Sequence, residues 1–440
     1  MPLIAIIYAA FISLGLPDGV LGAAWPQMAP SLHAPLAGAG ALALITSANT
    51  IVASFSSGWI LKRLSTVGVS ISSVALTVTG LLGCALAPNF WALALWCIPL
   101  GLGAGAIDSA LNAYVSLHFS ALHMNFLHAC WGLGAMTGPL IAGFFLNFTG
   151  QWRPTYATIA AAQTCLMLLL IVTRGSWPRK SQLPESDIPP AEVPTHEQPI
   201  DLGAGHDTPH ASTLAGNLAA DPSSTRSTPN PSGAQPTSAP AHTSAQPAPA
   251  ASSTPWYQIP LVWPTLIGFF CYCCAEGTIG LWASTFLAQY HHLTLALAAA
   301  AGSAFYIGIT VGRFLAGLAS LKFTNPQLLR LGATGLMAGI LLALLAPIPL
   351  LAVAGFALCG LGCAPIYPAV IKETGRRLGV ANVQRATGLQ MGFAYVGFML
   401  APPATGVALT AISPLALPTV VCALAAVMVG CHEYIERQLR

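Results

Sequence analysis

The chain has 440 residues, of which 55% are hydrophobic and only 7% are charged, with a formal net charge of +3. Soluble domains carry about 25% charged residues, so this composition excludes a water-soluble fold and predicts an integral membrane protein. No basic stripe with interleaved aromatic residues is present, and we therefore expect no nucleic-acid partner.

Six apolar runs occupy the first part of the chain, and each has the ~20 residues that a helix needs to cross a bilayer. They lie near residues 3–27, 37–61, 67–87, 91–117, 124–147 and 153–173. The first run lacks a basic leader and a cleavage site, so we expect it to be a retained span rather than a signal peptide.

Asp18 lies inside the first run, where an ionisable group costs roughly 2.5–3.5 kcal/mol and usually has a function. Gly15, Pro17 and Gly19 surround it, and these residues loosen a helix or remove its hydrogen bonds, so we expect the span to break there. Broken spans line the cavities of transporters. We therefore expect Asp18 to load and release a proton, with helix capping at a structural kink as the alternative.

The fourth and fifth runs carry further polar residues. Asp108 and Asn112 are one helical turn apart, on the same face as Gly101 and Gly105, where another helix can approach. This arrangement predicts a second ion-coupling acid, with an interhelical hydrogen bond as the alternative. His128 in the fifth run is a candidate for contact with the solute or for the proton route, although a lone histidine can also serve packing alone.

A segment rich in Pro, Ala, Ser and Thr, residues 178–255, follows the sixth run and has no periodicity. Such a composition cannot bury enough apolar surface to become ordered, so we expect a disordered linker. It joins an N-terminal half, residues 1–177, to a C-terminal half, residues 256–440. Six further apolar runs lie near residues 261–288, 296–320, 328–347, 349–371, 384–409 and 414–432.

Lysine and arginine residues gather on the side of the spans that both termini and the linker share, and only Arg153 lies opposite. Cytoplasmic loops carry such an excess, so we expect both termini to be cytoplasmic in a cell or inner membrane. Lys62, Arg63 and Arg313 lie near this end of their spans, and we expect them to act in gating.

The two halves repeat one another. The segment 80–107 aligns without gaps on 339–366, and Asp18-Gly19-x-x-Gly22 aligns, one residue out of register, with Glu276-Gly277-x-x-Gly280. Parallel repeats of six spans place a substrate site between the halves at mid-membrane; chance similarity among Gly-rich helices is the alternative. Glu276 is thus a third candidate for ion coupling, or an acceptor for solute hydroxyls, or a structural residue.

Several motifs resemble those of the major facilitator superfamily. Gly58-Trp-Ile-Leu-Lys62-Arg63 is similar to the family's loop signature after span two, with Lys62 where an aspartate is usual. Gly132-x-Gly134-x-x-x-Gly138-Pro139-x-x-x-Gly143 is similar to a span-five signature that is more often stressed in antiporters. The resemblance covers every span and implies an all-α fold of twelve transmembrane helices in two pseudo-symmetric halves.

Other motifs resemble the fucose–galactose–glucose:proton symporters. They are Gly15-Leu-Pro-Asp18-Gly-x-x-Gly22-x-x-Trp25-Pro26, Asp108-x-x-x-Asn112, Asn125-x-x-His128, Gly360-x-Gly362-x-Ala-Pro365-x-x-Pro368 and Gly388-x-Gln390. This resemblance implies functional acids in spans one and four, which match Asp18 and Asp108.

The function expected from these features is proton-coupled secondary transport of a sugar or a similar polar solute. Polar side chains would pair the solute's hydroxyl groups and aromatic rings would cover its apolar face; the candidates are Trp25, Asn112, His128, Trp131, Trp282 and Gln390. Sodium coupling, efflux of drug-like molecules by proton antiport and a non-transporting sensor remain alternatives.

No catalytic constellation, P-loop or metal-ligand spacing is present in the sequence. We therefore expect no enzymatic activity, no cofactor and no metal. The expected partners are a small solute, an ion and the lipid bilayer, and the expected state is a monomer.

Overall fold

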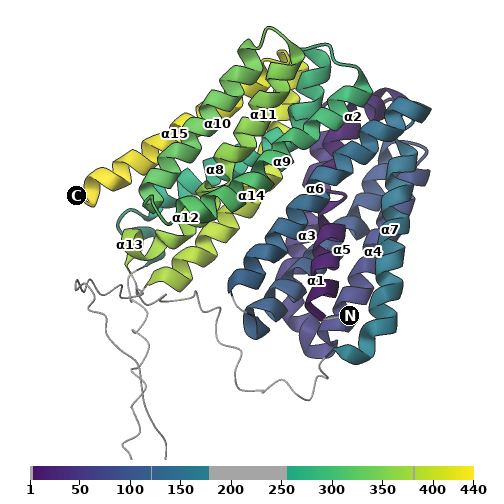
Figure 1. Cartoon of the computed structure of the whole chain (residues 1–440), viewed down its shortest axis with the longest axis horizontal. Coiled ribbons are helices and arrows are strands. Elements are labelled where there is room, and N and C mark those ends of the chain that lie inside the picture. The colour runs from purple at the N-terminus through teal and green to yellow at the C-terminus, as the bar shows by residue number, and fades with distance from the viewer. Residues whose placement is uncertain (1–2, 120, 178–254, 380–381) are drawn as a thin grey trace, which may run out of the picture. The chain divides into compact units, whose positions relative to one another are not determined.

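The structure is a computed structural model that describes residues 3–119, 121–177, 255–379 and 382–440, and it is built from helices (Figure 1). In these ranges twelve helical segments are long and apolar enough to cross a membrane, and no strand is present. They coincide with the twelve predicted spans to within a few residues, which confirms the all-α architecture. The predicted linker, apart from its last residue, lies outside the described residues.

The N-terminal half forms six spans, of which the first is divided. Ser65 and Asn89 begin the third and fourth spans, because their side chains accept hydrogen bonds from the amides of Gly68 and Ala92. The helices are α1 (Leu3–Gly15), α2 (Val20–Ser31), α3 (Gly38–Arg63), α4 (Thr66–Leu86), α5 (Phe90–His118), α6 (Ala121–Thr149) and α7 (Arg153–Thr173).

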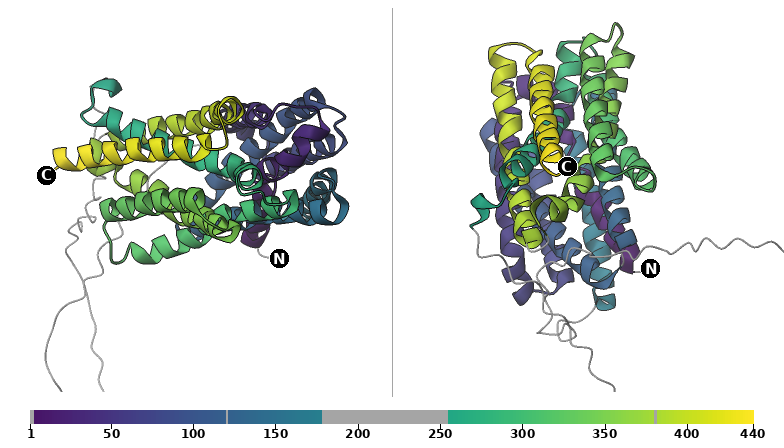
Figure 2. Two further views of the ribbon diagram at one scale, coloured as in Figure 1. Left: turned by 90° about the horizontal axis from the view of Figure 1, so that it is seen from above. Right: turned by 90° about the vertical axis from the view of Figure 1, so that its left-hand side faces the viewer.

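The C-terminal half also forms six spans. The tenth span of the chain, which lies in this half, is divided at Ala364 and Pro365. Thr324 and Gln327 form a capping box at the start of the ninth span of the chain. The helices are α8 (Val262–Gln289), α9 (Leu295–Ala319), α10 (Asn325–Leu345), α11 (Pro349–Cys363), α12 (Ile366–Lys372), α13 (Thr374–Leu378), α14 (Val383–Ala411) and α15 (Ala416–Gln438). Figure 2 shows them in teal to yellow, and its left-hand view shows them beside the purple to blue helices of the N-terminal half.

The first span breaks where the sequence predicts. The helix stops at Gly15 and resumes at Val20, so Asp18 lies in the turn between α1 and α2. Glycine is needed on both sides of Asp18 because the turn lies against α6. A Cβ atom at Gly15 would be 2.1 Å from the carbonyl oxygen of Trp131, and one at Gly19 would be 2.7 Å from the ring of Pro139.

We call the side of the spans where α1 begins the terminal side, and the opposite side the far side. The two halves touch through close backbone contacts on the far side. A Cβ atom at Gly22 would lie 2.4 Å from the carbonyl oxygen of Leu281 on α8. One at Gly40 on α3 would lie 2.5 Å from the Cα atom of Pro403 on α14. The two glycine motifs of the repeat, in α2 and α8, therefore pack against each other and close the far side.

The terminal side is less tightly packed. A Cβ atom at Gly388 or Gly392, in the first turns of α14, would have no neighbour within 4 Å. Asp18 and His128, which lie at mid-span or toward the terminal side, are both exposed. Backbone contacts close the far side, so these exposed side chains lie where the packing of the two halves is looser.

We predict that Gly22→Ala weakens closure of the far side, because the added methyl group has no room against the Leu281 carbonyl. Spin labels at Gln151 and His292, exposed far-side loop residues in the two halves, should report longer distances in the variant. The matched control is Gly430→Ala, where a Cβ atom would meet nothing within 4 Å. Identical distance distributions in wild type and Gly22→Ala would refute the closure that we assign to this contact.

Candidate solute and proton site

The Asp18 carboxylate combines a mid-span position with access to solvent. Its Oδ2 atom accepts a 2.6 Å hydrogen bond from the indole Nε1–H of Trp131 on α6. Trp131 is half-buried, whereas the Asp18 side chain is exposed. The helix break frees the carboxylate from a packed helix face, and the indole fixes one of its oxygens. The other oxygen is left for a proton, water or a solute.

Asp108 and Asn112 form the second polar group, on α5. The Asn112 Nδ2 atom donates a 3.0 Å hydrogen bond to Asp108 Oδ1, and both residues are half-buried. As the sequence predicts, the glycines of this helix admit a neighbour: a Cβ atom at Gly101 would lie 2.3 Å from the carbonyl oxygen of Thr46 on α3. Asp108 and Asp18 also interact electrostatically, so the two acids belong to one polar region.

Glu276, the repeat counterpart of Asp18, lies in a different setting. It is only 8% exposed and sits on the unbroken helix α8. The Tyr272 hydroxyl group, one turn earlier, donates a 3.1 Å hydrogen bond to the carbonyl oxygen of Cys363, next to the break between α11 and α12. The two repeat acids are therefore not equivalent, because solvent reaches Asp18 far more readily than Glu276.

Arg313 lies deeper than its expected gating position. Its guanidinium carbon is 5.4 Å from the centre of the Trp131 ring, so a cation from α9 of the C-terminal half covers an indole from α6 of the N-terminal half. Electrostatic interactions connect it with Glu276 and with His128. The sequence places the Cα atom of Arg313 near the end of its span, but the side chain reaches back toward the centre.

The other proposed gating residues stay near the terminal side. Arg63 is exposed at the end of α3, and the side chain of Lys62 lies outside the described residues. A gating role for this pair remains a prediction.

Three residues expected to contact the solute are fully buried in this conformation. Trp25 and Trp282 are fully buried, and their indole N–H groups donate to the backbone oxygens of Leu36 and Pro402 at 2.7 and 2.8 Å. Gln390 is also fully buried; its Oε1 atom accepts a 2.9 Å hydrogen bond from Thr374 on α13, and its Nε2 atom has no partner among the described residues. None of the three presents a surface to a solute in this conformation. Trp131, Asn112 and His128 remain as candidates.

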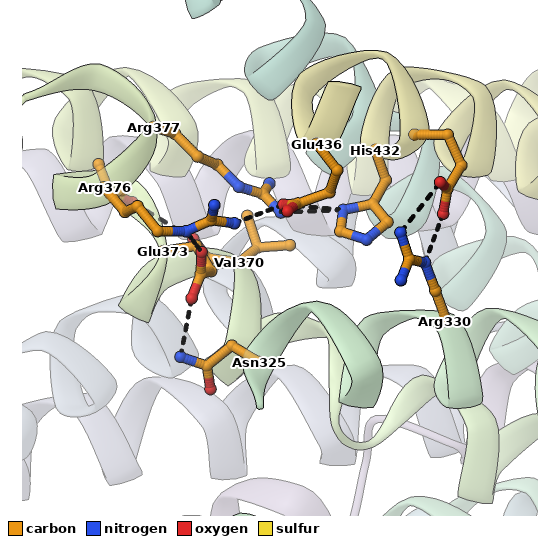
Figure 3. Close-up of polar contacts among 10 residues, drawn as sticks. Asn325, Arg330, Val370, Glu373, Arg376, Arg377, His432 and Glu436 are labelled. Atoms are coloured by element: carbon orange, nitrogen blue, oxygen red, sulfur yellow. Dashed lines mark hydrogen bonds and ion pairs between the residues drawn. The ribbon is translucent and has the colours of Figure 1, made fainter. Parts of the chain in front are cut away.

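A second polar cluster, not anticipated from the sequence, lies at the terminal side of the C-terminal half (Figure 3). Arg376 on α13 pairs with Glu373 and, at 2.5 Å, with Glu436 on α15. The buried Arg377 donates to His432 Nδ1 at 3.0 Å and lies 3.8 Å from Glu436. We call this cluster, residues 373, 376, 377, 432 and 436, the charged latch, because it ties α13 to α15.

The latch extends to the ninth span. Asn325 at the start of α10 donates a 3.0 Å hydrogen bond to Glu373, and Arg330 on the same helix makes a two-pronged pair with Glu433 at 2.6 and 3.0 Å. In the sequence, the i,i+3 spacing of Glu373 and Arg376 indicates a local ion pair. The partners on α15 follow only from tertiary packing.

Two glutamates on α15 allow a matched test of the latch. Glu436→Gln removes the anion next to the buried Arg377, and we expect it to destabilise the protein by about 1–3 kcal/mol. Glu433→Gln breaks a pair whose side chains are 36–41% exposed, and we expect a cost of about 0–1 kcal/mol. Thermal unfolding of the purified variants measures both, and equal losses would contradict the central position given to Glu436.

The family model for the major facilitator superfamily matches residues 7–257 and 265–436 of the chain. Bypass of stop codon protein 6 of Saccharomyces cerevisiae is 26% identical over 146 residues, which are 32% of this chain and 29% of that protein. An uncharacterised MFS-type transporter of Yersinia pestis is 26% identical over 155 residues, 34% of this chain and 40% of that protein. The aligned segments thus span less than half the length of either relative.

Solved structures with the same fold include three named transporters. A variant of the nucleoside transporter NupG has a TM-score of 0.67 at 12% identity, covering 99% of both chains. An inward-facing bacterial homologue of the human lysosomal transporter Spinster has a TM-score of 0.63 at 12% identity, covering 98% of this chain and 95% of the other. FucP in the outward conformation has a TM-score of 0.54 at 14% identity, covering 99% of both chains. With its twelve spans and this family match, the chain belongs to the major facilitator superfamily of membrane transporters.

Proposed function

We propose that the protein is a secondary active transporter that moves a sugar or a similar small polar solute by alternating access, coupled to protons. The observation that carries this proposal is the Asp18 carboxylate: it lies at a helix break in mid-span, is exposed to solvent, and is held by Trp131. A transporter needs such a group, because a coupling ion must enter from water and then cross within the protein.

Desolvation supplies the coupling. While the terminal side is open, water stabilises a charged Asp18. When the protein closes around it, an ionised carboxylate loses that water and becomes costly, unless a proton neutralises it or a partner pairs it. The proton-loaded form therefore closes more readily than the charged form. Movement of the proton then drives the conformational change that carries the solute.

Asp108 would hold the second coupling position. Its hydrogen bond from Asn112 and its electrostatic interaction with Asp18 make the ionisation of the two acids interdependent. Two neighbouring carboxylates resist being charged together, so protonation of one favours charge on the other. Glu276 is buried and interacts with Arg313 only electrostatically, so it would not be the entry point for the proton.

The solute would lie between the halves, near Trp131, Asn112 and His128. The indole offers a flat face, and the amide and imidazole groups replace the water that hydroxyl groups lose on binding. The structural neighbours support a solute of this kind, since they include a fucose:proton symporter and a nucleoside transporter.

The span-five glycine motif does not favour antiport in this protein, because packing accounts for it. A Cβ atom at Gly134 would lie 2.0 Å from the carbonyl oxygen of Ile12, and one at Gly138 would lie 2.1 Å from that of Leu16. These glycines let α1 and the Asp18 turn approach α6. The same packing would serve uptake or efflux.

The proposal also includes the orientation of the chain in the membrane. The excess of basic residues on the terminal side supports cytoplasmic termini, in which case this conformation opens to the cytoplasm. We also propose that residues 178–255 act as a tether between the two halves, which would need a minimum length rather than a particular sequence.

Asp18→Asn and Asp108→Asn should each abolish uphill accumulation of the solute, because an amide cannot exchange a proton. Uptake of labelled sugars into proteoliposomes under an imposed pH gradient measures this. Glu433→Gln is the control, since it removes an acid from the terminal-side surface without touching the centre. Normal gradient-driven accumulation by both aspartate variants would eliminate the coupling assignment.

Asn112→Ala and Gln390→Ala should differ in their effect on the solute. Loss of a direct hydrogen bond from Asn112 should weaken binding by about 1–3 kcal/mol. Gln390→Ala should have a smaller effect on affinity, because Gln390 is fully buried and its Oε1 atom is held by Thr374. Binding to purified protein is the measurement, and a larger loss in Gln390→Ala than in Asn112→Ala would move the site toward the terminal side.

A further inference from the structure

Arg313 has unused donors in the centre of the protein. A guanidinium group has five N–H donors in a planar fork, yet among the described residues Arg313 makes no hydrogen bond and no ion pair within 4.0 Å. Its nitrogen atoms are not among the buried polar atoms without a partner, and the residue is half-buried. The donors are therefore not fully enclosed by the protein.

Trp131 holds this cation in place. The guanidinium lies over the indole ring at 5.4 Å, and the N–H group of the same indole is occupied by Asp18. The indole thus positions a carboxylate at its edge and a cation over its face, and the two come from opposite halves. A fixed, planar cation with free N–H groups is the group that recognises a carboxylate with two parallel hydrogen bonds.

We propose that Arg313 binds a carboxylate of the solute, which makes the transported class a hydroxylated carboxylic acid such as a sugar acid. The inference rests on the proposed function, because it places the solute in the same central site. The hydroxyl groups of the solute would meet Asn112 and His128, and its acid group would meet Arg313.

The neighbouring charges favour a carboxylate over a phosphate. Asp18 contacts the same indole as Arg313, and Glu276 interacts with Arg313 electrostatically, so acidic groups already lie near this cation. A dianionic phosphate would be repelled more strongly than a monoanionic carboxylate. Protonation of Asp18 removes part of that repulsion, so the proton and the acid solute would assist each other's binding.

Charge balance provides a test that needs no variant. One proton with one monoanion carries no net charge, whereas one proton with a neutral sugar carries one positive charge. Uptake of a sugar acid should therefore respond to a pH gradient and not to membrane potential.

The experiment uses the full chain in proteoliposomes with labelled glucuronate and glucose as matched probes. We expect glucuronate uptake to follow an imposed pH gradient and to stay unchanged under a potassium diffusion potential set with valinomycin. Glucose should be a poor substrate. Accumulation of glucose driven by both the pH gradient and the potential, without glucuronate uptake, would overturn the inference and leave the proposed function intact.

Variants of Arg313 test whether this residue binds the carboxylate of the solute. Arg313→Gln should raise KM for glucuronate about 10- to 100-fold, the range expected for a lost charged hydrogen bond. Arg313→Lys should have a KM between those of the wild type and Arg313→Gln, because lysine keeps the positive charge but lacks the planar fork of N–H donors. Arg437→Gln, at the exposed C-terminus, is the control. An unchanged KM in a stable Arg313→Gln protein would overturn the assignment, and absence of gradient-driven uptake for both probes would overturn it together with the proposed function.

Discussion

A carboxylate in the middle of a membrane-spanning segment is costly, and much of the architecture can be understood as a response to that cost. Asp18 is tolerated because its helix is interrupted, its side chain reaches water, and Trp131 donates to one of its oxygens. In the proposed mechanism, the charged carboxylate loses its stabilisation when the protein closes around it, so the protein picks up a proton before it closes.

The same turn determines how the halves meet. Glycines on both sides of Asp18 let the broken span lie against α6, and Gly22 then brings α2 onto the backbone of α8. The acid and the interface are thus neighbours on one short segment. In the proposed transport cycle, a change in the charge of Asp18 would act within one turn of the contact that closes the far side, so no long route from Asp18 to this interface would be required.

The fold could be predicted from the sequence because membrane-spanning helices are recognised by their length and hydropathy. The break at Asp18 could be predicted from the glycines and the proline around it. Side-chain directions at the candidate site could not be predicted from the sequence. Trp25 and Trp282 follow the acid-glycine motifs but turn into the protein, where backbone oxygens take their N–H groups. Arg313 has a long side chain whose reach exceeds what its position in the helix indicates. The charged latch joins helices that are about 60 residues apart in sequence, and no local pattern reveals such a pairing.

The most direct test of the account is the movement of protons that a solute gradient drives. Proteoliposomes containing the full chain and an entrapped pH indicator, with no imposed pH gradient, would receive an inward gradient of the transported solute. The account predicts acidification of the lumen that requires both the solute and an intact Asp18 carboxylate. Solute entry at an undiminished rate without any change in internal pH would contradict it.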